Sequence, residues 1–166
     1  RQATLSNRAF VIDHSTEYKT YGPDMWGITS MRVPERYIMH YGPIPNGQNL
    51  AEHDGTISPS GPAGSMVFTP YLSLRVLKKM YIEHPDLWGV YGFKDSINMD
   101  RYWISPIYYG LGQGILLLQI ENFRSGFVWK YFGKNKWVQK GLSAVEFKKD
   151  KSRLKPAPSL LSDRLK

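Results

Sequence analysis

The chain has 166 residues, of which 42% are hydrophobic and 14% aromatic, and its formal net charge is +8. This length suffices for one domain with a buried core. The sequence contains no cysteine, which excludes disulfides and thiolate metal sites. The longest apolar run, Ile115 to Leu118, is far too short to cross a bilayer, so no membrane span is predicted.

The positive charge is concentrated near the C-terminal end. Residues 148–166 hold seven Lys or Arg against two Asp, a net charge of +5, whereas residues 1–147 carry only +3. A charge run of this kind is more typical of a solvated tail than of a nucleic-acid-binding face. We therefore expect one domain, or a piece of one, over residues 1–147, a basic tail over residues 148–166, and no nucleic acid partner.

The first third of the sequence predicts one helix followed by long loops. Apolar residues at helical spacing indicate an amphipathic helix over residues 5–19. Gly-Pro and related dipeptides then break residues 21–68 repeatedly, which predicts irregular structure throughout. The end of this stretch, rich in small residues, carries His53 and Asp54. Such a loop before a helix is either a ligand site or an ordinary surface loop.

A second helix is predicted over residues 70–84. Thr69 suits the N-cap and Pro70 the first turn, while His84-Pro85 should end the helix. Its apolar face combines Leu72 and Val76 with two flanking leucines, Leu74 and Leu77. An irregular aromatic segment follows over residues 87–106.

The last part of the sequence is helical again. Residues 114–123 are apolar nearly all round, which predicts a buried helix. Ser125 can cap a helix over residues 127–132, and Asn135 can cap another that runs to about residue 145. No strand pattern competes with these helices. The fold class is therefore predicted to be all-α.

The sequence lacks the common motifs for phosphate, metal or nucleophilic chemistry. Its four histidines are scattered, so neither a metal site nor a cofactor is expected. What remains are carboxylates together with aromatic rings in the predicted loops, and on the 114–123 helix: Asp24, Asp54, Asp95, Asp100 and Glu121 with Trp26, Tyr41, Trp88, Tyr91, Phe93 and Trp103. Glycosidases use this combination, because rings stack on sugars and carboxyl groups handle the protons.

Several sequence strings carry a resemblance to a known family. The main ones are His53-Asp54-Gly55-Thr56-Ile57-Ser58-Pro59, Leu87-Trp88-Gly89-Val90-Tyr91-Gly92-Phe93-Lys94-Asp95, and Gln113-Gly114 with Ile120-Glu121-Asn122-Phe123-Arg124-Ser125-Gly126. In this order they resemble the C-terminal half of the bacterial glucoamylase-like domain. That family includes the endo-β-1,2-glucanases of glycoside hydrolase family 144 and domains of cyclic β-1,2-glucan synthases. The resemblance covers about residues 5–147.

The resemblance implies a fold and an activity. The fold would be an (α/α)6 toroid barrel with a glucan cleft made by loops at one end, to which this chain contributes the later helices. The activity would be hydrolysis of a β-linked glucan, with β-1,2-glucan favoured, in the periplasm or outside the cell. The N-terminal half of the barrel would be the partner of this chain and would hold the general acid.

The sequence departs from the family at three places. The family usually has an Asp where this chain has Gly112, and often one where it has Ile107. Its Ser-Asp-Gly string after Trp-Gly is replaced here by residues 29–34. The loss of these acidic groups leaves an alternative open: a carbohydrate-binding protein on the same barrel that no longer hydrolyses its ligand.

Asp54 is the catalytic candidate of this chain, because it could hold substrate or water in the cleft. Its alternative role is an Asx turn within its own loop. Glu121 must be paired, with Arg124 or a loop N–H, so a structural role suits it equally well. The other candidates for substrate binding are Trp26, His53, Trp88, Tyr91, Phe93, Trp103 and Gln113. We expect one or two of these tryptophans to face the cleft and the rest to fill the core.

Overall fold

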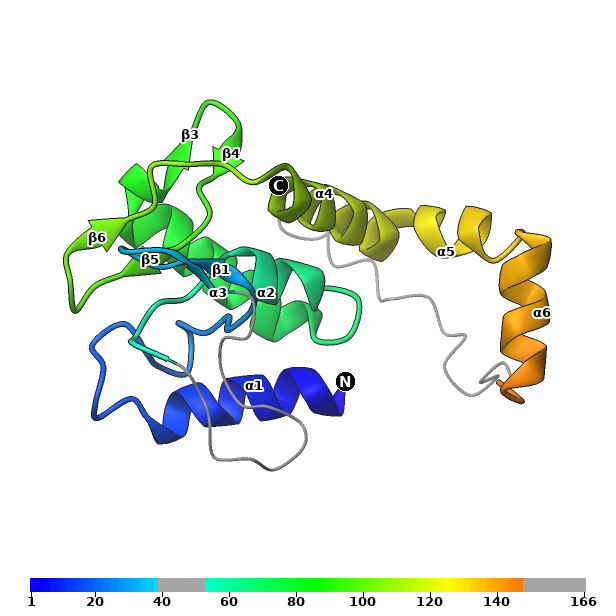
Figure 1. The fold of residues 1–166 in the computed structure, drawn as a ribbon, viewed down its shortest axis with the longest axis horizontal. Coiled ribbons are helices and arrows are strands. Elements are labelled where there is room, and N and C mark those ends of the chain that lie inside the picture. Colours follow the sequence, from blue (N-terminus) through cyan, green and yellow to red (C-terminus); the bar gives the residue numbers. More distant parts are fainter. Residues whose placement is uncertain (39–52, 148–166) are drawn as a thin grey trace, which may run out of the picture. The chain divides into compact units, whose positions relative to one another are not determined.

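The computed structural model describes residues 1–38 and 53–147 (Figure 1). The chain divides into two compact units, Arg1–Val128 and Trp129–Lys166, and each is described here by itself. The first unit holds four α-helices in its described part, which are α1 (Gln2–Asp13), α2 (Ser60–Gly64), α3 (Pro70–Glu83) and α4 (Gly110–Ser125). Helix α5 (Phe127–Phe132) begins in the first unit and ends in the second, and α6 (Lys136–Ala144) lies in the second.

Helix α1 is shifted from its prediction. It begins at Gln2 and ends at Asp13, not at residue 19. His14 closes it, because its backbone N–H donates to Phe10 O at 3.2 Å while its ring Nδ1 lies 2.8 Å from the same oxygen. Tyr18 therefore stands in a turn beyond the helix, close to the loop that follows.

Helix α3 confirms the prediction within one residue. Pro70 occupies its first turn and His84 its C-cap. The buried face consists of Ser73, Val76, Leu77 and Met80, whereas Leu74 is exposed, so the predicted apolar face was too wide on one side. The hydroxyl of Thr69 caps no N–H of the helix, and its partners are Ser65 O at 3.3 Å and Ser73 Oγ at 3.4 Å.

Helix α2 contradicts the expectation that residues 53–68 are irregular throughout. It is short and rich in glycine, which gives it little helix propensity of its own. Tertiary packing stabilises it instead, because it contacts both α3 and α4 and buries Pro62 and Ala63. Gly61 lets it approach the preceding loop, since a Cβ at this position would stand 2.7 Å from Gly27 Cα.

Three antiparallel strand pairs also contradict the all-α prediction in detail. They are β1 (Met31–Arg32) with β2 (Tyr37–Ile38), β3 (Trp88–Gly89) with β4 (Gly92–Phe93), and β5 (Ile97–Asn98) with β6 (Trp103–Ile104). A 3-10 turn, η1 (Pro85–Leu87), leads into β3. Each strand has two residues, too few for an alternating pattern to be seen in the sequence. Helices make up most of the regular structure in the described residues, and these strand pairs lie in the segments between them.

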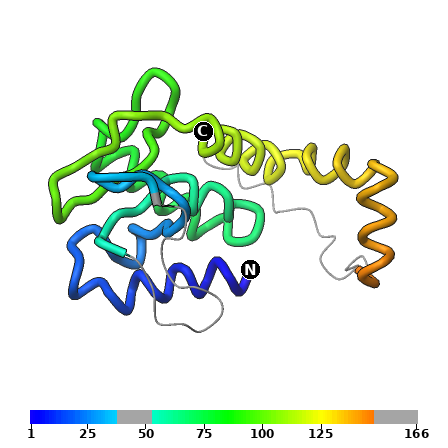
Figure 2. The backbone as a smooth tube through the Cα atoms, viewed as in Figure 1, coloured from blue at the N-terminus to red at the C-terminus, as the bar shows by residue number. Residues whose placement is uncertain are grey.

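The core of the first unit joins α1, the following loops and α3. Its most completely buried large side chains are Val11, Trp26, Met31, Ile57, Met66, Val76, Met80 and Leu87. Ile57 reaches this core through backbone pairing with β5: its N–H donates to Ile97 O at 3.0 Å and its carbonyl accepts from Ile97 N at 2.9 Å. Figure 2 shows this loop returning to the middle of the unit between α1 and α2.

Helix α4 was predicted to be buried, and this was wrong. Leu116, Ile120 and Phe123 pack against the core, but Leu111, Leu117 and Leu118 are exposed, and Asn122 is its one fully buried residue. An apolar face of this kind on a described helix is typical of a surface that another part of a protein covers. None of the helices in the described ranges is long and apolar enough to cross a membrane.

Both predicted caps in the C-terminal part are confirmed. Ser125 Oγ accepts the backbone N–H of Phe127 at 3.2 Å, at the start of α5. In the second unit, Asn135 Oδ1 accepts the backbone N–H of Trp137 at 2.9 Å, at the start of α6. These local hydrogen bonds follow from the sequence because they need no tertiary partner.

Burial along α3 gives a test of the fold. Met80 is 0% exposed and Ile82 is 61% exposed on the same helix. We expect Met80→Ala to lower the free energy of unfolding by about 2–5 kcal/mol, because it leaves a cavity in the core. The control, Ile82→Ala, should change it by no more than about 0.5 kcal/mol. Denaturant unfolding followed by circular dichroism measures both. Equal losses would contradict this packing.

Candidate functional site

The β3–β4 hairpin and helix α4 line an open cavity of about 640 Å³. Four of the predicted substrate-binding residues line it: Trp88, Tyr91, Phe93 and Gln113. The rest of its wall is Gly92, Tyr108, Gly110, Leu116, Leu117 and Ile120. The tertiary structure thus brings together residues that the sequence keeps in two separate segments.

The aromatic rings of this cavity hold one another in place. Trp88 stands edge-on to Phe93, with ring centroids 4.8 Å apart, and Tyr91 meets Tyr108 edge-on at 5.4 Å. Trp88 is 45% exposed and Tyr91 72%, whereas Phe93 is only 6% exposed. Trp88 and Tyr91 can therefore offer ring surface to a ligand, while Phe93 packs edge-on against Trp88.

Gln113 connects the two walls of the cavity. Its side-chain Nε2 donates a hydrogen bond to the carbonyl of Phe93, which fixes the first turn of α4 against β4. The chain passes close by at Gly92, whose φ of +91° favours glycine, and a Cβ there would lie 3.4 Å from Gln113 Oε1. Gln113 is therefore at once a wall of the cavity and a structural tie.

A small recess adjoins this cavity and shares Phe93, Gln113 and Leu116 with it. Its volume of about 10 Å³ is enough for roughly one water molecule. Its other lining residues are polar or small: Ser58, Pro59, Ser60, Lys94, Asp95, Tyr109 and Gly112. A large apolar and aromatic cavity beside a polar recess suits a ligand with both flat faces and hydroxyl groups.

Asp95 is the one acidic residue among the described residues that line this recess. In the sequence it is one of five carboxylates near aromatic rings, and it is not among the predicted site residues. It is 9% exposed, and its Oδ2 accepts hydrogen bonds from Arg32 N at 2.7 Å and Ser96 Oγ at 3.4 Å. Burial raises the pKa of this carboxyl, and the hydrogen bonds and the charge of Arg32 only partly oppose that. Its place at the end of the 87–95 string and its membership of the carboxylates near aromatic rings were the two available signals.

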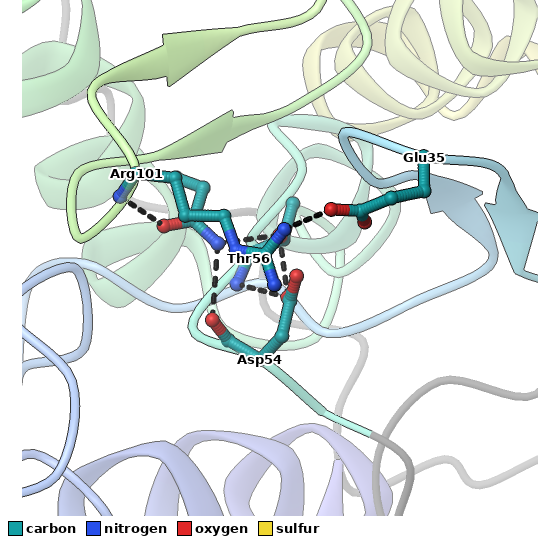
Figure 3. Close-up of polar contacts among 5 residues, drawn as sticks. Glu35, Asp54, Thr56 and Arg101 are labelled. Atoms are coloured by element: carbon teal, nitrogen blue, oxygen red, sulfur yellow. Dashed lines mark hydrogen bonds and ion pairs between the residues drawn. The ribbon is translucent and has the colours of Figure 1, made fainter.

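Asp54 does not line this cavity, and its carboxylate bonds to Thr56 of its own loop (Figure 3). Its Oδ1 accepts from Thr56 N at 3.0 Å and from Thr56 Oγ1 at 2.6 Å, which is an Asx turn. Asn98 Nδ2 donates to Asp54 O at 3.0 Å, and Arg101 pairs with Glu35 nearby. These contacts favour the structural alternative for Asp54. A role in the cleft stays a prediction.

His53 belongs to a ring cluster between α1 and the loop. Its ring centroid lies 4.8 Å from that of His14, 5.0 Å from Phe10 and 5.3 Å from Tyr18. Burial and then the neighbouring His14 lower the pKa of His53, against the opposing effect of Glu17 and Asp54. Its contacts are those of a packing residue that anchors the start of the loop to α1.

Three further predicted residues lie apart from the cavity of the β3–β4 hairpin. Trp26 is 1% exposed, and it lines a separate cavity with residues of α1 and α2. Trp103 is half-buried in β6, and its Cα pairs with that of Asn98. Glu121 forms an ion pair with Arg124 at 3.0 Å, the partner that the sequence suggested. Tyr41, also noted in the sequence, lies outside the described residues.

The arrangement is typical of proteins that bind carbohydrate, and comparison with known proteins gives the family. The family model described as "Putative glucoamylase" matches residues 1–136. The chain therefore belongs to this glucoamylase-like family.

Relatives and solved structures carry related names. The chain is 34% identical over 141 residues to the exo beta-1,2-glucooligosaccharide sophorohydrolase (non-reducing end) of Parabacteroides distasonis, a match over 84% of this chain and 19% of that protein. The structure of an endo-beta-1,2-glucanase from Chitinophaga pinensis is 33% identical, with a TM-score of 0.73 over 84% of this chain and 32% of that one. A beta-1,2-glucanase from Parabacteroides distasonis is also 33% identical, with a TM-score of 0.76 over 86% of this chain and 20% of that one. The chain thus spans between about a fifth and a third of the lengths of these relatives.

The His53 cluster predicts how stability depends on pH. Since the pKa of His53 in the folded state lies below the ordinary value of 6.5, the unfolded chain binds the proton at a higher pH than the folded protein does. The contribution of His53 to the free energy of unfolding is complete above about pH 6.5 and is lost as the pH falls toward the folded-state pKa. We expect His53→Phe, which keeps a ring in the cluster, to flatten the fall of the unfolding free energy between about pH 7 and 5.

The measurement is denaturant unfolding at several pH values. Burial also lowers the pKa of His84, so some slope should remain in His53→Phe. A slope identical to that of the wild type would show that His53 does not titrate differently in the folded protein.

Proposed function

We propose that this chain forms part of an (α/α)6 toroid barrel that hydrolyses a β-linked glucan, with β-1,2-glucan as the favoured substrate. The observation that carries the proposal is the convergence of Trp88, Tyr91, Phe93 and Gln113 on one open cavity. It is supported by the family to which the chain belongs and by the names of its relatives.

In this proposal the cavity is one section of the glucan cleft. Exposed faces of Trp88 and Tyr91 stack on glucosyl rings, and water attacks an anomeric carbon while an acid protonates the leaving oxygen. That acid belongs to a part of the family domain that this sequence does not include. The same part of the barrel covers the exposed leucines of α4, among them Leu111 and Leu117. A periplasmic or extracellular location also belongs to the proposal, on the family resemblance alone.

The full-length protein allows a direct test of the cleft. We expect wild-type protein to release reducing ends from β-1,2-glucan, and Trp88→Ala to weaken glucan binding about tenfold because a stacking ring is lost. Tyr71→Ala is the control, since Tyr71 is an exposed aromatic residue on α3 of the same unit and does not line the cavity. Reducing-end assays and binding isotherms measure the two effects. Equal glucan binding by both variants would show that the cavity is not part of the glucan cleft.

A second function, glucan binding without hydrolysis, is favoured by one observation. Gly112 lines the recess where the family usually has an Asp, and a Cβ built there has Ser60 Cβ at 3.8 Å as its nearest neighbour. The site therefore has space for the side chain that this sequence lacks. Among the described residues that line the recess, Asp95 is the one carboxyl group.

Gly112→Asp separates the two functions. If the chain is part of a hydrolase, wild-type protein hydrolyses glucan without this carboxylate. If it only binds, wild-type protein shows no turnover, and Gly112→Asp is the variant that should gain it. Gly112→Asn controls for side-chain size without an ionisable group. Reducing-end release from the three proteins at equal concentration distinguishes hydrolysis from glucan binding alone.

A further inference from the structure

The recess beside the aromatic cavity has the dimensions of a site for one water molecule. It holds about 10 Å³, and it shares Phe93, Gln113 and Leu116 with the cavity in which a glucosyl ring would stack. A water in the recess would thus stand beside the bound sugar. The hydroxyls of Ser60 and Tyr109 and the amide of Gln113 line the same space and can orient it.

The recess also contains a carboxyl group in a fixed position. Both hydrogen bonds that described residues donate to the carboxylate of Asp95 go to Oδ2, from Arg32 N at 2.7 Å and Ser96 Oγ at 3.4 Å. Oδ1 is therefore left to accept from a ligand or a water. The backbone of this residue is fixed too, because its carbonyl accepts Ser58 Oγ at 2.6 Å and its N–H donates to Ile107 O at 3.1 Å.

We propose that Asp95 is the general base of the reaction and that the recess holds the attacking water. This inference rests on the proposed function. The oxygen of the water forms a bond to the anomeric carbon as the glycosidic C–O bond breaks. Asp95 Oδ1 takes one proton from the water, and the acid outside this sequence gives one to the leaving oxygen. One glycosidic bond and one water thus become two hydroxyl groups.

The surroundings of Asp95 support this role. The titratable and charged groups that face it are Arg32 of β1, Tyr37 of β2, and Lys94 and Tyr109 in the recess. Burial is the main cause of its raised pKa, which makes it a stronger base than an exposed Asp. Activity should therefore fall, as the pH is lowered, through a pKa above the ordinary range of Asp. Gly112 leaves Asp95 without a second carboxylate in the recess.

The test uses the full-length protein and kinetics on β-1,2-glucan. Asp95→Asn keeps an acceptor for Arg32 N and removes the ionisable group. We expect kcat to fall by about 10²–10⁴, KM to change by less than about threefold, and the acid limb of the pH profile to disappear. Asp86→Asn, at an exposed Asp of η1, is the control and should behave as the wild type.

A second variant keeps the test decisive if Asp95→Asn fails to fold. Gly112→Leu leaves every hydrogen bond of Asp95 in place and puts a side chain into the space of the water. We expect it to lower kcat at least about tenfold at unchanged thermal stability. An active wild type whose Asp95→Asn variant keeps both kcat and the acid limb would overturn the role of Asp95 and leave the proposed function standing. A wild type that binds glucan without hydrolysing it would overturn both.

Discussion

The site depends on the pairing of residues 56–58 with residues 95–98. Two backbone hydrogen bonds join Ile57 to Ile97, and Ser58 Oγ donates to Asp95 O at 2.6 Å. Asn98, fully buried, adds a bond from Nδ2 to Thr56 Oγ1 at 2.9 Å. Because buried polar groups are costly unless they are paired, this contact permits one register only. It sets the recess wall that Ser58 and Ser60 form against Asp95.

The site has two unlike halves. On one side, the β3–β4 hairpin offers large exposed rings over an apolar floor from α4. On the other, polar side chains from the 58–60 loop, from Lys94 to Asp95 and from Tyr109 enclose a space for one small group. A sugar has both apolar C–H faces and hydroxyl edges, so such a pairing of surfaces matches its chemistry better than either half alone.

Helix α4 contributes to both halves of the site and also exposes apolar surface. Its first turn serves the site through Gln113, while Leu111, Leu117 and Leu118 expose apolar surface. The chain spans about a third or less of its relatives. A helix that looks buried in the sequence and is exposed in the structure is understandable if the pattern was set by contacts beyond this segment. The conflict between pattern and burial on α4 is consistent with the proposal that other segments of the barrel cover this helix.

Interactions between residues close in the sequence determine part of this structure. The start and end of α3, the Ser125 and Asn135 caps, the Asx-turn alternative for Asp54 and the pairing of Glu121 with Arg124 all involve neighbours within a few residues, so the sequence predicts them. Its motifs also gave the family and four residues of the cavity. Only the tertiary structure decided that α2 is helical, that Trp26 is buried, and that Asp95 shares a recess with Gly112. Those features arise from contacts between segments that are distant in the sequence. Such contacts leave no regular hydrophobic pattern from which they could be predicted.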